Sequence, residues 1–198
     1  MKGTTMFALF LFSSALFSYL PWATADFVLD IDGNPIVNGA AYHILPAIWA
    51  VGGGIAYAKT GNETCPLTVV VENSEVDPGL PIKISSPALI AFITTDLRLE
   101  LAFTTVPKCA PTPSKWTVVE GLPQGPAVKL TGYDHTVRGS FNIEKSGFSF
   151  AYKLRFCAAD TDTCVHIGLH VLDFHKTLVV TEDYPLDVVF RKANHVDA

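Results

Sequence analysis

Short runs of apolar and β-branched residues, separated by turn signals, make up most of the chain. In residues 150–156 (Phe-Ala-Tyr-Lys-Leu-Arg-Phe) apolar and polar side chains alternate, as expected for a strand that buries one face. Similar runs predict strands over residues 68–71, 82–84, 97–103 and 141–143. Glycine and proline mark turns between these runs, so the pattern predicts an all-β sandwich or barrel.

An internal repeat narrows this choice. Three times, a strand that ends in Val-Val precedes a strand that begins with Pro: 67–70 before 81–84, 116–119 before 126–130, and 177–180 before 185–189. Three such units predict a closed all-β structure of about twelve strands with pseudo-threefold symmetry, the β-trefoil arrangement. Because Val-Val is common in β-proteins, chance similarity is the alternative.

The first 25 residues have the features of a secretory signal peptide. Lys2 precedes an apolar stretch over residues 6–17, and Ala23-Thr24-Ala25 supplies an A-x-A cleavage pattern. A retained membrane anchor is the alternative, but the stretch is short and interrupted by serines. We therefore expect residues 1–25 to be removed and residues 26–198 to form one domain. We expect this mature chain to be secreted, to the apoplast or a vacuole, without a membrane contact.

The cysteines fit an oxidising compartment. An even number of four, Cys65, Cys109, Cys157 and Cys164, indicates two disulfides, for which three pairings exist. Only residues 158–163 separate the last two, which favours Cys157–Cys164 with Cys65–Cys109. Zinc is the alternative, but the chain has no C-x-x-C pair. Asn62-Glu63-Thr64 is the single N-glycosylation sequon, and makes Asn62 a possible modification site.

Composition and motifs argue against several classes of function. Only 17% of residues are charged and the net charge is −5, so no basic face is expected for a nucleic acid. The chain lacks the G-x-S-x-G, H-E-x-x-H and phosphate-loop motifs, and we expect neither an enzyme nor a cofactor. The run Gly52–Gly54 lacks the lysine of a phosphate loop and is interpreted as a flexible bend or bulge. We expect His166 and His170 to share one face of a strand and His175 to lie on the other, without a metal.

One segment is a candidate binding loop. It lies between the predicted strands 82–84 and 97–103 and consists of Ser85, Ser86, Pro87, Ala88, Leu89, Ile90, Ala91 and Phe92. Pro87 restricts its own φ and biases Ser86 toward extended geometry. Outward display of the pair Leu89-Ile90 is costly unless a partner binds it. The alternative is that the segment is another core strand.

The mature chain resembles the plant Kunitz inhibitors of the soybean trypsin inhibitor type along essentially its whole length. The opening 26–30, the turns 33–35 and 38–39, and Cys65-Pro66 with 67–70 carry much of this resemblance. Further matching segments are 42–44, 60–63, 85–87, 116–120, 122–123, 125–129, 152–154, 156–157 and 187–190. The small animal Kunitz domain is different, because its dense cysteines are absent here.

The resemblance implies a monomeric β-trefoil with the two disulfides favoured above and reversible, one-to-one inhibition of serine proteases. It aligns the family's reactive bond with Leu89-Ile90. It aligns a loop-supporting asparagine with Asn38, which would hold the loop backbone from beneath.

The chain departs from the trypsin-inhibiting pattern at this bond. Those relatives carry Arg or Lys where this chain has Leu89, and the soybean-type inhibitor has another Arg where this chain has Ala91. A buried carboxylate in the trypsin pocket needs a cation, whereas chymotrypsin-, elastase- or subtilisin-like pockets accept an apolar side chain. The residue therefore predicts an apolar preference. The alternative is a non-inhibitory relative, such as a seed storage or miraculin-like defence protein.

Overall fold

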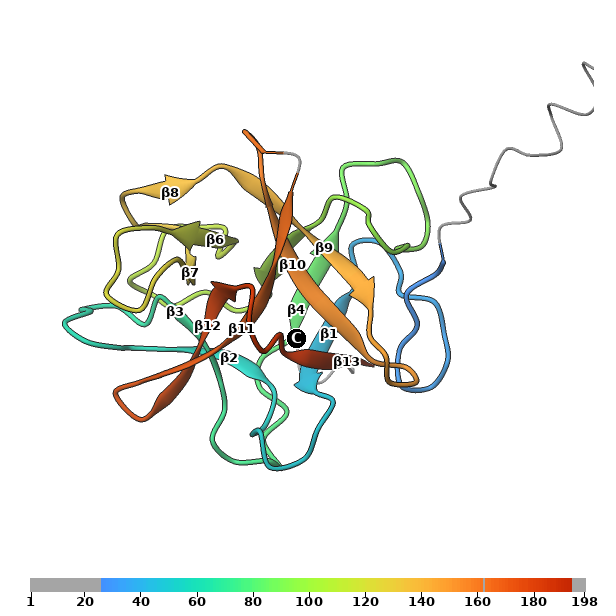
Figure 1. The fold of residues 1–198 in the computed structure, drawn as a ribbon, viewed down its shortest axis with the longest axis horizontal. Coiled ribbons are helices and arrows are strands. Elements are labelled where there is room, and N and C mark those ends of the chain that lie inside the picture. Colours follow the sequence, from blue (N-terminus) through green and yellow to red (C-terminus); the bar gives the residue numbers. More distant parts are fainter. Residues whose placement is uncertain (1–25, 162, 194–198) are drawn as a thin grey trace, which may run out of the picture.

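The fold is built from β-strands alone. The computed structural model describes residues 26–161 and 163–193, and this part of the chain contains thirteen strands and no helix (Figure 1). The expected leader 1–25 and Asp162 lie outside the described residues. The strands are β1 (Ala41–Pro46), β2 (Ile55–Ala58), β3 (Thr68–Val71), β4 (Ile82–Ser85), β5 (Glu100–Phe103), β6 (Trp116–Val119), β7 (Ala127–Leu130), β8 (Thr136–Val137), β9 (Gly139–Lys145), β10 (Tyr152–Ala158), β11 (Cys164–Leu172), β12 (His175–Thr181) and β13 (Asp187–Lys192).

The strands form one connected antiparallel network. Its order is β5-β4-β1-β13-β10-β11-β12-β3-β7-β6-β8, with β2 on β3 and β9 on β10. The longest pairings are the hairpins β9–β10 and β11–β12. In β10, Tyr152, Leu154 and Phe156 are buried and the residues between them are half-buried, as the sequence pattern predicted. None of the described residues belongs to a helix long and apolar enough to span a membrane.

A chain of aromatic contacts crosses the core. Tyr57, Phe103, Trp116, Phe141 and Phe156 contact one another in sequence, with ring centroids 5.2–5.9 Å apart. Tilted and edge-to-face contacts of this kind stabilise a core beyond the area that they bury. They link strands β2, β5, β6, β9 and β10 into one apolar interior.

Two predicted strands are shorter than expected. The run 97–103 forms strand only from Glu100, because Leu99 makes an isolated bridge to Phe141 instead. The run 150–156 forms strand only from Tyr152, because Phe150 adopts a positive φ of 59° in the preceding turn. Phe150 is exposed there, so its apolar character does not mark a core position.

The three Val-Val segments of the repeat all lie in strands, β3, β6 and β12, and each is followed by the strand that begins after the proline. Their pairing differs, however. Strands β6 and β7 are direct neighbours, whereas neither β3 and β4 nor β12 and β13 are paired. The repeat therefore describes the succession of strands better than their hydrogen bonding.

The glycine run is packed tightly, which corrects the flexible bend expected from the sequence. A Cβ on Gly53 would lie 2.2 Å from the carbonyl oxygen of Ser74, and one on Gly54 would lie 1.8 Å from that of Pro78. Gly53 N–H donates to Glu72 O, and Gly54 N–H to Asp77 O, both at 2.8 Å. Glycine is needed at these positions because two backbone segments touch.

Two disulfides join the strands and loops, in the pairing favoured from the sequence. Cys65–Cys109 links positions 44 residues apart, and Cys157–Cys164 links positions 7 residues apart. The second bridge joins directly opposed residues of β10 and β11. No cysteine in the described part of the chain is free.

A buried ion pair lies between the turn after β2 and strand β7. The side chain of Lys129 is only 3% exposed, and its Nζ lies 2.7 Å from Glu63 Oε1 and 2.5 Å from Thr68 Oγ1. Tyr133 donates a further hydrogen bond to Glu63, and the Thr60 N–H donates to Oε2 at 3.0 Å. Burial alone would raise the pKa of Glu63, but these hydrogen bonds together lower it below its ordinary value.

Candidate functional site

The loop between β4 and β5 displays the most exposed large apolar side chain among the described residues. Leu89 is fully exposed, at 105% of its reference area, while Ile90 is 38% and Phe92 41% exposed. Figure 1 shows this loop projecting from one end of the molecule, beyond β4. The alternative of a buried core strand over this segment is therefore wrong.

A tight turn places Leu89 at the apex of the loop. The Ile90 N–H donates to the carbonyl oxygen of Ala88 at 2.9 Å, which closes a turn around Leu89. The Ala88 N–H donates to Ser86 Oγ at 3.2 Å, on the other side of Pro87. Local hydrogen bonds and the fixed φ of proline thus shape the segment and point its apical side chain at solvent.

Asn38 braces the loop from beneath. Its Oδ1 accepts the Ser86 N–H at 2.8 Å, and its Nδ2 donates to Ile90 O at 3.1 Å. The same Nδ2 lies 3.3 Å from Ala88 O and 3.4 Å from Ser86 O. One side chain therefore holds backbone groups on both sides of the Leu89-Ile90 bond.

The chain that leaves the loop is fixed by two other backbone segments in succession. The Asn38 N–H donates to Ala91 O and the Ile93 N–H donates to Ile36 O, which pairs residues 91–93 with residues 36–38. The Val28 N–H donates to Ile93 O and the Thr95 N–H donates to the carbonyl of residue 26, which pairs residues 93–95 with residues 26–28. The side chain of Ile93 is completely buried. The residues that follow Ile90 are consequently anchored in the body of the protein.

Two supporting residues were not identified from the sequence. Phe27 packs edge-on against Phe92 with ring centroids 5.9 Å apart, and both rings are partly exposed beside the loop. The buried hydroxyl of Tyr42 accepts the Val37 N–H at 3.0 Å, directly before Asn38. Burial raises the pKa of Tyr42, more than the Val37 hydrogen bond lowers it, so the phenol stays neutral.

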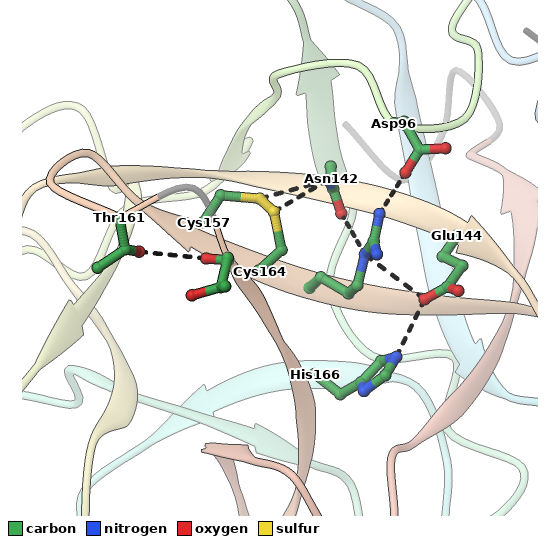
Figure 2. Close-up of a disulfide and its surroundings, with 9 residues drawn as sticks. Asp96, Asn142, Glu144, Cys157, Thr161, Cys164 and His166 are labelled. Atoms are coloured by element: carbon green, nitrogen blue, oxygen red, sulfur yellow. Dashed lines mark hydrogen bonds and ion pairs between the residues drawn. A yellow bond between two sulfur atoms is a disulfide. The ribbon is translucent and has the colours of Figure 1, made fainter. Parts of the chain in front are cut away.

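Another polar cluster surrounds the Cys157–Cys164 bridge (Figure 2). Asn142 Nδ2 lies 3.3 Å from the Cys157 sulfur, and Asn142 Oδ1 accepts Arg155 Nε–H at 2.9 Å. Arg155 also pairs with Asp96, and Glu144 Oε2 lies 3.0 Å from His166 Nε2. The donors and acceptors satisfy one another, so this cluster braces the β9–β11 sheet.

The histidines do not form a metal site in the described residues. His166 and His170 lie on β11, as expected, but His175 begins β12 instead of occupying the opposite face of the same strand. Within residues 26–161 and 163–193, no three His, Cys, Asp or Glu side chains gather closely enough to hold an ion.

Comparison with known proteins identifies relatives over nearly the whole chain. Residues 28–192 match the legume Kunitz family model, described as trypsin and protease inhibitor. Trypsin inhibitor A of Glycine max is 46% identical over 198 residues, covering 96% of this chain and 91% of the relative. Trypsin inhibitor DE-3 of Erythrina caffra is 44% identical over 168 residues, covering 83% of this chain and 97% of the relative.

A solved structure supports the same assignment. The soybean trypsin inhibitor, in its complex with porcine pancreatic trypsin, superposes with a TM-score of 0.80 at 43% identity. The match covers 85% of this chain and 100% of that chain. The predicted β-trefoil is thereby confirmed, with thirteen strands where about twelve were expected. The matching family is made of protease inhibitors and not of enzymes.

Proposed function

Because the chain belongs to the legume Kunitz family of trypsin and protease inhibitors, we propose that it inhibits serine proteases through the Leu89-Ile90 bond. The observation that carries this proposal is a fully exposed Leu89 at the apex of a loop whose backbone Asn38 holds on both sides. The protease-contact loop comprises residues 85–92, with Asn38 as its support. The partner is one protease molecule per inhibitor.

The loop inhibits as a substrate mimic. Residues 86–91 enter the protease cleft in their existing shape, so little conformational entropy is lost on binding. The protease serine attacks the Leu89 carbonyl carbon, and the amine of Ile90 is the leaving group. Because Asn38 and the paired segment 91–95 hold that amine in place, it re-forms the peptide bond before water intervenes.

Leu89 directs the inhibitor to proteases with an apolar primary pocket. Burying a leucine side chain in such a pocket contributes roughly 1.5–3 kcal/mol. In a trypsin pocket the same side chain leaves a buried carboxylate without a partner, which costs about 1–3 kcal/mol or more. Ala91, where the soybean-type inhibitor has a second arginine, likewise offers no positive charge to a trypsin-like protease. The exposed rings of Phe27 and Phe92 add apolar surface next to the cleft.

The protein acts outside the cytosol. The leader pattern over residues 1–25 directs the chain into the secretory pathway, and the two disulfides suit an oxidising compartment. Cleavage after Ala25 leaves a monomer of residues 26–198, delivered to the apoplast or a vacuole.

Parallel titration of trypsin, chymotrypsin, elastase and subtilisin with the mature protein tests this function. We expect the apolar-pocket enzymes to be inhibited more tightly than trypsin. Leu89→Arg should reverse that order, changing each inhibition constant on the order of 100-fold. Val76→Arg is the matched control, because it adds the same charge at a residue that is 92% exposed in another loop.

Two other results of this titration would contradict the proposed function, each in a different way. Tight trypsin inhibition that Leu89→Arg leaves unchanged would assign the activity to another loop. Absence of inhibition of all four enzymes would refute the inhibitor function and favour a storage or defence role on the same scaffold.

A further inference from the structure

We propose that Asn62 carries an N-linked glycan in the mature protein, on the side of the molecule opposite to the protease-binding loop. The proposal rests on the secretory route but not on protease inhibition. It concerns the Asn62-Glu63-Thr64 sequon, in which the hydroxyl at the third position assists transfer to the asparagine amide.

The sequon lies on a surface turn that presents the asparagine. The Glu63 N–H donates to Thr60 O at 3.2 Å, which closes a turn with Gly61 at a φ of +56°. The Gly61 N–H donates to Asp173 Oδ2 at 2.6 Å and fixes the turn to the β11–β12 hairpin. Asn62 is thus held on an exposed turn at the surface, where a bulky glycan can be accommodated.

The three sequon side chains divide between surface and interior. Asn62 and Thr64 are exposed, and neither makes a side-chain hydrogen bond with the described part of the chain. Glu63 between them points inward to the ion pair with Lys129. Substituting Nδ2 of Asn62 therefore breaks no contact of the fold, while the middle residue keeps the turn in place.

The surroundings leave room for a sugar. An open pocket of about 590 Å³ lies beside the turn, and its lining includes Asn62, Leu67, Leu122, Pro123, Tyr133 and Leu172. Apolar and aromatic side chains of this kind give the first sugar ring a surface on which to lie. A glycan over this pocket would also shield its apolar lining from water.

The site is remote from the proposed inhibitory surface. Figure 1 shows the turn between β2 and β3 at one end of the molecule and the loop between β4 and β5 at the other. A glycan at Asn62 consequently leaves access to Leu89 open, and inhibition should not depend on it.

The reaction joins Nδ2 of Asn62 to the anomeric carbon of an oligosaccharide carried on a lipid diphosphate. The bond between that carbon and the diphosphate oxygen breaks, the lipid diphosphate leaves, and the amide nitrogen loses one proton. No oxidant or reductant takes part. The donor is available only in the secretory pathway, where the leader would deliver the chain.

Expression of the full chain in plant cells, followed by intact-mass analysis and peptide mapping of the mature protein from the apoplast or the vacuole, tests the proposal. We expect added mass in hexose and N-acetylhexosamine increments, located at Asn62. Thr64→Ala and Asn62→Gln should abolish it, and Thr64→Ser should retain it because the hydroxyl is kept. An unmodified Asn62 in protein that has reached the apoplast or a vacuole, or a chain that never enters the secretory pathway, would overturn the proposal.

A second measurement separates this proposal from the proposed function. Glycosylated and enzymatically deglycosylated protein should titrate the same protease with equal inhibition constants. If deglycosylation instead strengthens inhibition, the glycan is not remote from the contact surface and its assigned position is wrong. If neither form inhibits but Asn62 is modified, the inhibitor function fails and the glycan proposal stands.

Discussion

The support of the loop by Asn38 gives a sharp mutational test. Asn38→Ala removes one hydrogen bond accepted from Ser86 N–H and the two amide hydrogens that serve the carbonyls of Ser86, Ala88 and Ile90. The remaining contacts of the loop, including its pairing at Ala91, stay intact. The variant should therefore fold, with a loop whose apex samples more conformations.

The size of the effect follows from these contacts. Two amide hydrogens and one acceptor make three effective bonds, each contributing about 0.5–1.5 kcal/mol to the ordered loop. Part of this energy is recovered when the protease itself orders the loop. We expect the inhibition constant to rise roughly 10- to 100-fold, equivalent to about 1.4–2.8 kcal/mol. The protease should also hydrolyse the Leu89-Ile90 bond faster, because Asn38 no longer holds the Ile90 carbonyl and the cleaved ends separate before the bond re-forms.

Asn73→Ala is the matched control. Asn73 is exposed and donates a single hydrogen bond to the Phe174 carbonyl at 3.3 Å, outside the loop and its supports. Inhibition constants for chymotrypsin and urea unfolding curves should be measured for both variants. Equal inhibition by wild type, Asn38→Ala and Asn73→Ala, with equal rates of loop cleavage, would refute the role assigned to Asn38.

Two further predictions concern stability. Because its hydrogen bonds lower the pKa of Glu63, the ionised carboxylate stabilises the fold above about pH 4.5, and this contribution is lost as the pH falls. Glu63→Gln should lower the free energy of unfolding by about 3 kcal/mol at pH 7, and that free energy should then fall less steeply as the pH is lowered. Urea unfolding curves measured across this pH range test this, and a variant with the same pH dependence of stability as the wild type would contradict it. Replacing both cysteines of Cys65–Cys109 should lower the free energy of unfolding by about 4 kcal/mol, because this bridge closes a loop between positions 44 residues apart in the unfolded chain. Replacing Cys157 and Cys164, which are only 7 residues apart, should lower it by about 2 kcal/mol. Equal losses in reversible unfolding, or the opposite order, would contradict the chain-entropy argument.

Local sequence patterns predicted the features that depend on neighbouring residues. Alternation identified β10, and Pro87 with the Leu89-Ile90 pair identified the exposed loop. The boundary errors have local causes too, since the positive φ of Phe150 places an apolar side chain in a turn. Periodicity cannot reveal such a change, because it counts side chains and not backbone conformation.

Contacts between distant segments were not predictable from pattern alone. Lys129 occupies a polar position of a short apolar run, yet it is buried because Glu63 meets it from the turn after β2. Phe27 supports the loop through Phe92, which lies 65 positions further along the chain, and Tyr42 supports it through the Val37 N–H directly before Asn38. Asn38 itself was expected only from the family resemblance, since a single asparagine before a glycine otherwise indicates no more than a turn.

Identification of the bond that a target protease cleaves tests the central claim most directly. The mature protein is incubated with a catalytic amount of chymotrypsin, and new N-termini are sequenced while residual inhibition is measured. The account predicts one slow cleavage, with a new N-terminus at Ile90, in protein that still inhibits. Cleavage at another bond while inhibition persists, or immediate loss of inhibition on cleavage at Leu89-Ile90, would contradict it.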